Sequence, residues 1–154
     1  MSVAQRLKDQ NITLPPAAAP VASYVATVVS GNMLFVSGQL PIESGEVAVK
    51  GHLGKDVSLE DGVRAAQLCA LNIVAQVSAA LDGNLDRVAR CVKLGGFVAS
   101  TPEFTDHPKV INGASDFIVS VFGDTGKHAR AAVGVAALPR GTAVEIEAIF
   151  EIKP

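Results

Sequence analysis

The sequence contains no tryptophan and a single tyrosine, and aromatic residues make up 5% of the chain. Valine, isoleucine, leucine and alanine must therefore build most of the interior of a chain that is 49% hydrophobic. Charged residues account for only 18%, a composition that argues against disorder. An alanine-rich interior under a surface with little charge hints at further burial through self-association.

Cysteine and histidine are also scarce. The spacing of Cys69 and Cys91 fits neither a redox motif nor a zinc site, and both lie in apolar segments, so we interpret them as buried, inert thiols. The three histidines, His52, His107 and His128, fall in separate polar segments without metal-ligand spacing. The sequence predicts no metal and no cofactor.

Positive charge is neither abundant nor clustered. The net charge is −2 and no run of Lys or Arg occurs, which gives no reason to expect a nucleic-acid partner. No apolar stretch reaches the roughly 18 to 20 residues needed to span a bilayer, and residues 1–11 carry charges where a signal peptide would be apolar. We expect a soluble cytoplasmic protein that is not membrane-bound.

The hydrophobic pattern predicts one α+β domain over residues 1–154, with an N-terminal extension over 1–16 and two helices on one face of a mixed sheet. Ser58 is expected to cap the longer helix, and Gly95-Gly96 indicates a bulge or a close approach in the strand that follows it. In chain order we expect a short helix at 2–11, a hairpin of strands 24–29 and 33–36, a short strand near 47–49, a helix at 59–81, a strand at 88–99, a helix at 107–123 and strands at 130–137 and 143–152.

The C-terminal hairpin contains the most informative residues. Arg130 begins an otherwise uncharged strand, and the return strand carries Glu145 and Glu147 between apolar residues. Strict alternation puts both glutamates on one face, opposite Val144, Ile146 and Ala148. Nucleotide-binding, serine-hydrolase and zinc-protease motifs are absent from the chain.

Two segments resemble the RidA/YjgF family, which is also named endoribonuclease L-PSP. Residues 130–149, RAAVGVAALPRGTAVEIEAI, are similar to its C-terminal signature, and residues 31–41, GNMLFVSGQLP, match its N-terminal hairpin. Tyr24 and Asn112 stand where the family has an active-site tyrosine and a helix asparagine. The resemblance covers about residues 17 to 152 of this chain.

The resemblance implies a chorismate-mutase-like fold, assembled as a homotrimer with the sheets facing inward and clefts between subunits. It also implies hydrolytic deamination of reactive enamines and imines, such as 2-aminoacrylate, to 2-keto acids and ammonia. Arg130 would bind the substrate carboxylate and Glu145 would position or activate water. By the same resemblance, the residues that would contact the rest of the substrate are Tyr24, Gly38, Asn112 and Ala132.

The chain also departs from the family pattern. Deaminases of the family often read Pro-Ala-Arg-Ser-Cys at the arginine, whereas residues 128–132 read His-Ala-Arg-Ala-Ala. A protein that binds a 2-keto acid in the same cleft without turnover therefore stays an alternative. A ribonuclease, suggested by the family's other name, has no basic groove or aromatic platform to support it. His128 is a titratable group two residues before Arg130, in a position typical of a loop histidine.

Overall fold

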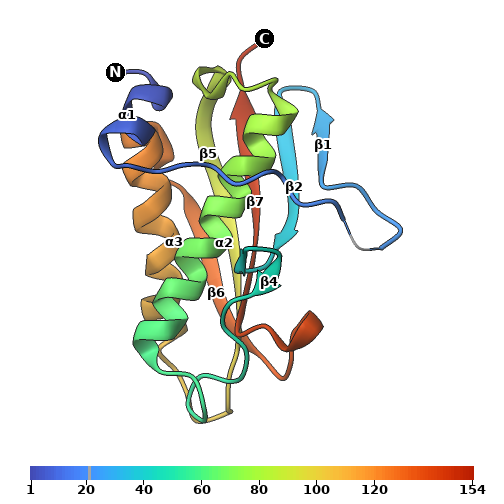
Figure 1. Cartoon of the computed structure of the whole chain (residues 1–154), viewed down its shortest axis with the longest axis vertical. Coiled ribbons are helices and arrows are strands. Elements are labelled where there is room, and N and C mark those ends of the chain that lie inside the picture. The colour runs from blue at the N-terminus through green and yellow to red at the C-terminus, as the bar shows by residue number, and fades with distance from the viewer. Residues whose placement is uncertain (21) are drawn as a thin grey trace.

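The computed structural model describes residues 1–20 and 22–154, and it places the two long helices on one face of a five-stranded sheet (Figure 1). The helices are α1 (Val3–Asp9), α2 (Leu59–Ala80) and α3 (His107–Phe122). The strands are β1 (Thr27–Ser30), β2 (Met33–Gln39), β3 (Ile42–Glu43), β4 (Glu46–Val47), β5 (Val88–Ala99), β6 (Ala129–Val135) and β7 (Val144–Ile152).

The large sheet has the order β1-β2-β7-β5-β6, and β3 pairs with β4 in a separate ribbon. Strands β5 and β6 are parallel and joined through α3, whereas the other pairs of the large sheet are antiparallel. This mixed sheet, covered on one face by α2 and α3, confirms the predicted α+β class and the expected chorismate-mutase-like architecture. Strand β6 ends the sheet, so its outer edge has no strand beside it among the described residues.

Helix α2 begins where the sequence predicts. The hydroxyl of Ser58 accepts a hydrogen bond from the backbone N–H of Asp61 at 3.1 Å, which satisfies one free donor of the first turn. By length and composition α2 is apolar enough to cross a bilayer, contrary to expectation, but 56% of that apolar window is buried inside the fold. Since α2 packs on both the sheet and α3, it is the core helix of a soluble-type α+β domain.

Both cysteines lie in the core, as predicted. Cys69 of α2 is fully buried and Cys91 of β5 is 1% exposed. Burial raises the pKa of the Cys69 thiol well above its ordinary value, and it raises the pKa of Cys91 to about 12. Because the thiolate is the reactive form, both side chains are chemically inert in the folded protein.

The predicted bulge at Gly95-Gly96 is absent, since both glycines pair in register with β7, and the irregularities of this ladder lie between Val88 and Lys93. The alternative expectation, a close approach, is confirmed. A Cβ at Gly95 would come within 2.9 Å of the Glu147 side chain, and one at Gly96 would come within 2.7 Å of Ile111 on α3. The predicted strand at 47–49 is replaced by the short pair β3 and β4, and the first hairpin strand begins at Thr27 rather than residue 24.

Glycine also permits the two long helices to touch. A Cβ at Gly113 of α3 would overlap the backbone carbonyl oxygen of Val63 on α2, an atom that cannot rotate away. We expect Gly113→Ala to destabilise the fold by about 2 kcal/mol, since overpacking commonly costs 1–3 kcal/mol. The midpoint of thermal unfolding, followed by circular dichroism, should fall by roughly 4–8 °C. Asp116→Ala, at an exposed position of the same helix, is the control and should leave the midpoint nearly unchanged; equal midpoints for both variants would contradict close helix contact at Gly113.

Candidate functional site

The two glutamates of β7 lie on the face of the sheet that the helices leave uncovered. Glu145 pairs with Phe97 and Glu147 with Gly95 of β5, whereas the intervening Ile146 is fully buried under the helices. The predicted shared face of the two acids is therefore confirmed. The ladder between β2 and β7 is irregular between Val36 and Gln39, next to Glu145.

Glu145 lies against the backbone of Gly38 in this irregular part of β2. A Cβ at Gly38 would come within 2.8 Å of Oε1 and 3.1 Å of Cγ of Glu145. Glycine at position 38 thus leaves the space that the glutamate side chain occupies. Any larger side chain would have to displace the carboxylate.

A pocket of about 270 Å³ opens in front of this carboxylate. Three of the residues proposed from the sequence line it together: Tyr24 from the segment before β1, Gly38 from β2 and Glu145 from β7. Arg140, from the turn that connects β6 and β7, lines it as well. The remaining lining residues are Ala18, Ala19, Pro20, Ala22, Ala26, Gln39, Leu40, Ile42 and Pro139.

The partly buried position of Glu145 changes its proton affinity. Burial raises the pKa of this carboxyl because it disfavours the charged form, and the negative charge of Glu147 raises it further. A carboxylate with a raised pKa is a better proton acceptor than an exposed glutamate.

Arg130 lies on the other face of the sheet. Leu94 of β5 is fully buried under the helices, and Gly96 faces Ile111 of α3. Because β6 pairs with β5 so that Arg130 is beside Leu94 and Ala132 is beside Gly96, both of these β6 residues point to the helix side. Arg130 and Glu145 are thus separated by the sheet within one chain.

Helix α3 holds the Arg130 guanidinium at two points. Nη1 donates to the hydroxyl of Ser115 at 3.1 Å, and Nη2 donates to the carbonyl oxygen of Pro108 at 3.1 Å. Asn112 is exposed and falls between these two residues at helical spacing, so it belongs to the same stripe of α3. The structure therefore brings Arg130, Asn112 and Ala132 together at the contact between β6 and α3.

His128 extends this network, and its two hydrogen bonds determine which ring nitrogen carries the proton. Nδ1 lies 2.6 Å from the carbonyl oxygen of Gly126, which can only accept, so the proton of the neutral ring is on Nδ1. Nε2 then accepts from the hydroxyl of Ser115 at 2.8 Å, while the same oxygen accepts from Arg130. His128 thus orients the hydroxyl of Ser115, and this hydroxyl in turn positions the Arg130 guanidinium.

The six residues proposed from the sequence form two groups of three rather than one site. Tyr24, Gly38 and Glu145 make the acid group on the open face, and Arg130, Asn112 and Ala132 make the arginine group on the helix side. Sequence reasoning did not find Ser115, His128 as its partner, or Arg140. The spacing of three residues between Asn112 and Ser115 on one helix was a signal for Ser115.

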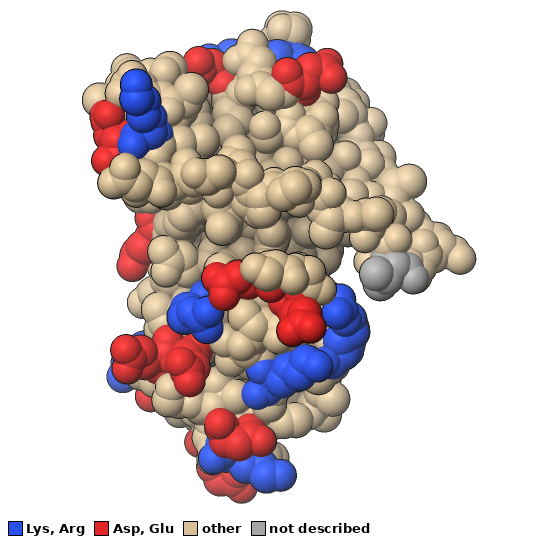
Figure 2. Space-filling model, viewed as in Figure 1, with Lys and Arg blue, Asp and Glu red and all other residues tan. Residues whose placement is uncertain are grey.

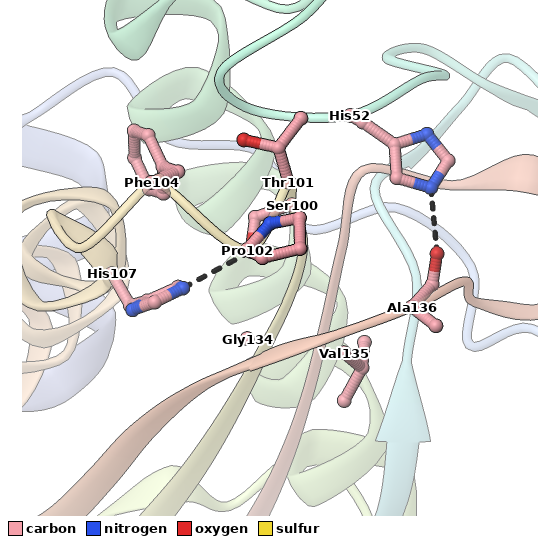
Figure 3. A pocket seen from close by; sticks show the side chains of 9 residues that line it. All are labelled: His52, Ser100, Thr101, Pro102, Phe104, His107, Gly134, Val135 and Ala136. Carbon is pink, nitrogen blue, oxygen red and sulfur yellow. Dashed lines mark hydrogen bonds between the residues drawn. The ribbon is translucent and has the colours of Figure 1, made fainter.

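A second, larger cleft of about 550 Å³ lies at the far end of β6 (Figure 3). In Figure 3, His52 and His107 stand on opposite sides of it. Nε2 of His107 is 3.0 Å from the hydroxyl of Ser100, and Nε2 of His52 is 2.7 Å from the carbonyl oxygen of Ala136. Both rings are thus engaged by the protein, and neither group of candidate residues reaches this cleft.

The chain is similar to a known protein family over most of its length. Residues 4–149 match a family model described as YjgF/chorismate mutase-like, whose description also proposes an endoribonuclease. The chain is 52% identical over 151 residues to protein TCP17 of Trypanosoma cruzi, covering 97% of this chain and 94% of that one. It is 30% identical over 144 residues to a protein of Dermatophagoides farinae named 2-iminobutanoate/2-iminopropanoate deaminase, covering 92% and 95%.

Among solved structures, the crystal structure of Atu1372 from Agrobacterium tumefaciens, a protein of unknown function, superimposes with a TM-score of 0.92. The two sequences are 55% identical, and the match covers 98% of this chain and 92% of the other. The agreement extends over nearly the whole chain, so the two proteins share the architecture described above.

Proposed function

Because this chain belongs to the RidA/YjgF family, we propose that it is a cofactor-independent hydrolase that deaminates small carboxylate-bearing imines and enamines, such as 2-aminoacrylate. The proposal is carried by two observations: a partly buried carboxylate in a pocket on the open face, and an arginine hydrogen-bonded to α3 on the helix side. The relative in Dermatophagoides farinae is named for this reaction.

The proposed reaction gives roles to two residues of the chain, and it acts on the imine form, which 2-aminoacrylate reaches when its methylene carbon gains a proton and its nitrogen loses one. Arg130 binds the substrate carboxylate through its planar pair of N–H donors. Glu145 accepts a proton from water as the water oxygen bonds to the imine carbon and the C=N electron pair moves to nitrogen. Glu145 returns this proton to the nitrogen. The C–N bond then breaks as the hydroxyl oxygen becomes the carbonyl oxygen, the hydroxyl proton passes to the leaving ammonia, and a 2-keto acid remains. Since the imine is already reactive, orientation of the reactants supplies much of the acceleration.

We further propose that the acid group and the arginine group meet between two copies of the chain, in a homotrimer with inward-facing sheets. Within one chain the two groups lie on opposite faces of the sheet. The open face also exposes apolar side chains, since Val28, Phe35 and Val133 are each 43–50% exposed there. Association of copies through this face would cover these side chains and complete the site.

The ribonuclease alternative has less support in the arrangement of charge. Figure 2, which views the molecule from the helix side, shows Lys and Arg side chains interspersed with Asp and Glu. Binding to a nucleic-acid backbone requires concentrated positive charge. Two unpaired thiols fit a reducing compartment, so we place the proposed reaction in the cytoplasm.

The test is the release of pyruvate and ammonia from 2-aminoacrylate generated in situ by a serine dehydratase. The wild-type chain should accelerate pyruvate formation above the spontaneous rate, in proportion to its concentration. No acceleration by an intact oligomer would remove the deaminase proposal. Binding of a 2-keto acid in that case, measured by calorimetry, would favour the non-catalytic alternative.

The hydrogen bond from Arg130 to Ser115 gives a graded prediction. Ser115→Ala should raise the KM for 2-aminoacrylate roughly three- to tenfold, because one net hydrogen bond contributes about 1 kcal/mol to the position of the guanidinium. Ser120→Ala is the matched control, since its hydroxyl bonds to Phe117 on the same helix and away from Arg130. Steady-state kinetics of the two variants should differ; equal KM values would mean that Ser115 does not position the arginine.

A further inference from the structure

Arg140 is a positive charge in the acid group's pocket that the proposed reaction does not use. It lines the pocket together with Tyr24, Gly38 and Glu145. Among the described residues it forms no ion pair and donates no hydrogen bond from its side chain. Its guanidinium is therefore available to a ligand.

The backbone at Arg140 is held in an unfavourable conformation. Its φ of 59° lies in the left-handed region, which costs a residue with a Cβ on the order of 1 kcal/mol. The residues that follow Arg140 are bonded to a distant segment, because the N–H of Gly51 donates to the carbonyl oxygen of Gly141 and the N–H of Ala143 donates to that of Val49. An arginine kept in such a position, beside a pocket, is typical of a functional constraint.

Glu145 is not the partner of this arginine. A guanidinium in contact with Glu145 would lower the pKa of that carboxyl, whereas burial and Glu147 raise it. Both residues therefore face the same pocket without neutralising one another. A ligand that enters the pocket meets both a proton acceptor and a cation that forms no ion pair among the described residues.

We propose that Arg140 binds a second anionic group of the substrate, so that the preferred substrates are 2-imino dicarboxylates rather than monocarboxylates. This inference rests on the proposed function, in which Arg130 binds the carboxylate next to the imine. Arg140 binds the distal carboxylate through its planar fork of donors. The pocket of about 270 Å³ is smaller than the roughly 300–1,000 Å³ of sites for drug-sized ligands, which suits a small metabolite. The chemistry is unchanged: water replaces the imine nitrogen and ammonia leaves.

The test compares the affinities of two stable product analogues, 2-oxoglutarate and 2-oxobutanoate, by calorimetry on the full chain. The wild type should bind 2-oxoglutarate roughly ten- to a hundredfold more tightly, as expected for one additional charge-assisted pair. Arg140→Asn should bring this ratio close to one, since asparagine tolerates positive φ but carries no charge. Arg140→Lys should retain part of the preference.

Two further variants separate charge from folding. Arg140→Gly relieves the backbone strain and should lose the preference like the asparagine variant. Lys50→Ala removes an exposed cation next to the same turn, and the ratio should stay at its wild-type value. Equal wild-type affinities, no binding of either acid, or a preference that survives in Arg140→Asn would each overturn the inference. Because binding needs no turnover, preference for 2-oxoglutarate without deamination of any imine would uphold Arg140 as a carboxylate-binding residue while the proposed function failed.

Discussion

Arg130→Ala is expected to lower kcat/KM for the hydrolysis of 2-aminoacrylate roughly a hundredfold to ten-thousandfold. Two charge-assisted hydrogen bonds to the substrate carboxylate are lost, and each ordinarily contributes about 1.5–3 kcal/mol. Arg130→Lys should recover only part of the rate, since an ammonium group is a point charge without the planar fork. Pyruvate formation under steady-state conditions measures the effect.

The control for this variant is Arg64→Ala, which removes a surface arginine whose partner is Glu43 at 3.0 Å. Both variants lose one positive charge, but only Arg130 belongs to the arginine group. If the Arg64 variant lost as much activity as the Arg130 variant, the effect would reflect overall charge or folding rather than carboxylate binding.

The shared site can be tested by mixing two inactive variants. Arg130→Ala and Glu145→Gln chains, allowed to exchange subunits, should together regain up to about a quarter of the wild-type activity, because a quarter of adjacent pairs then contain one intact site. Activity that stayed at the level of the separate variants after exchange would mean that each site is built within one chain.

Glu145→Gln is expected to have the second large effect, with activity and stability changing in opposite directions. The amide cannot accept the proton of water, so kcat should fall roughly a hundredfold or more. In the wild type, activity should decline as the pH falls through the raised pKa of Glu145, at a higher pH than an ordinary exposed glutamate would give. In Glu145→Gln, that limb of the pH–rate profile should be missing.

The stability effect follows from the same raised pKa. The folded protein holds the Glu145 proton to a higher pH than the unfolded chain does. The contribution of this group to stability is therefore complete below its unfolded pKa and is lost as the pH rises through its folded pKa. At neutral pH the ionised carboxylate destabilises the fold, and glutamine removes this cost. Urea unfolding at pH 7 should show Glu145→Gln to be more stable than the wild type, with the difference vanishing in acid; a less stable variant at pH 7 would contradict burial of the charge.

Much of the fold and part of the candidate site could be predicted from the sequence, because strand alternation and helix capping agree there with the tertiary packing. Alternation in β7 correctly placed Glu145 and Glu147 on the open face, and the cap at Ser58 correctly set the start of α2. The face taken by Arg130 could not be predicted in this way. The residues after it, Ala-Ala-Val-Gly-Val, do not alternate between polar and apolar, so pairing with β5 and contact with α3 decide the matter.

Arg140 was missed for a different reason. Its turn, Leu138-Pro139-Arg140-Gly141, has an ordinary composition: Gly141 takes the positive φ that glycine favours, at 71°, but Arg140 before it takes one as well, at 59°. The residues after Arg140 bond to the segment around Gly51, more than eighty residues earlier in the chain. Bonds formed over such a distance leave no local pattern in the sequence.

Because both thiols are buried, the folded chain should not react with alkylating reagents, and this has a practical use. Cys69 and Cys91 cannot compete for a probe while the protein is folded. A cysteine introduced at Ala132, which is only partly buried beside Arg130, would be the one fast-reacting sulfur of the molecule. Its rate of modification would report, in real time, when a ligand or a neighbouring copy occupies that side of β6.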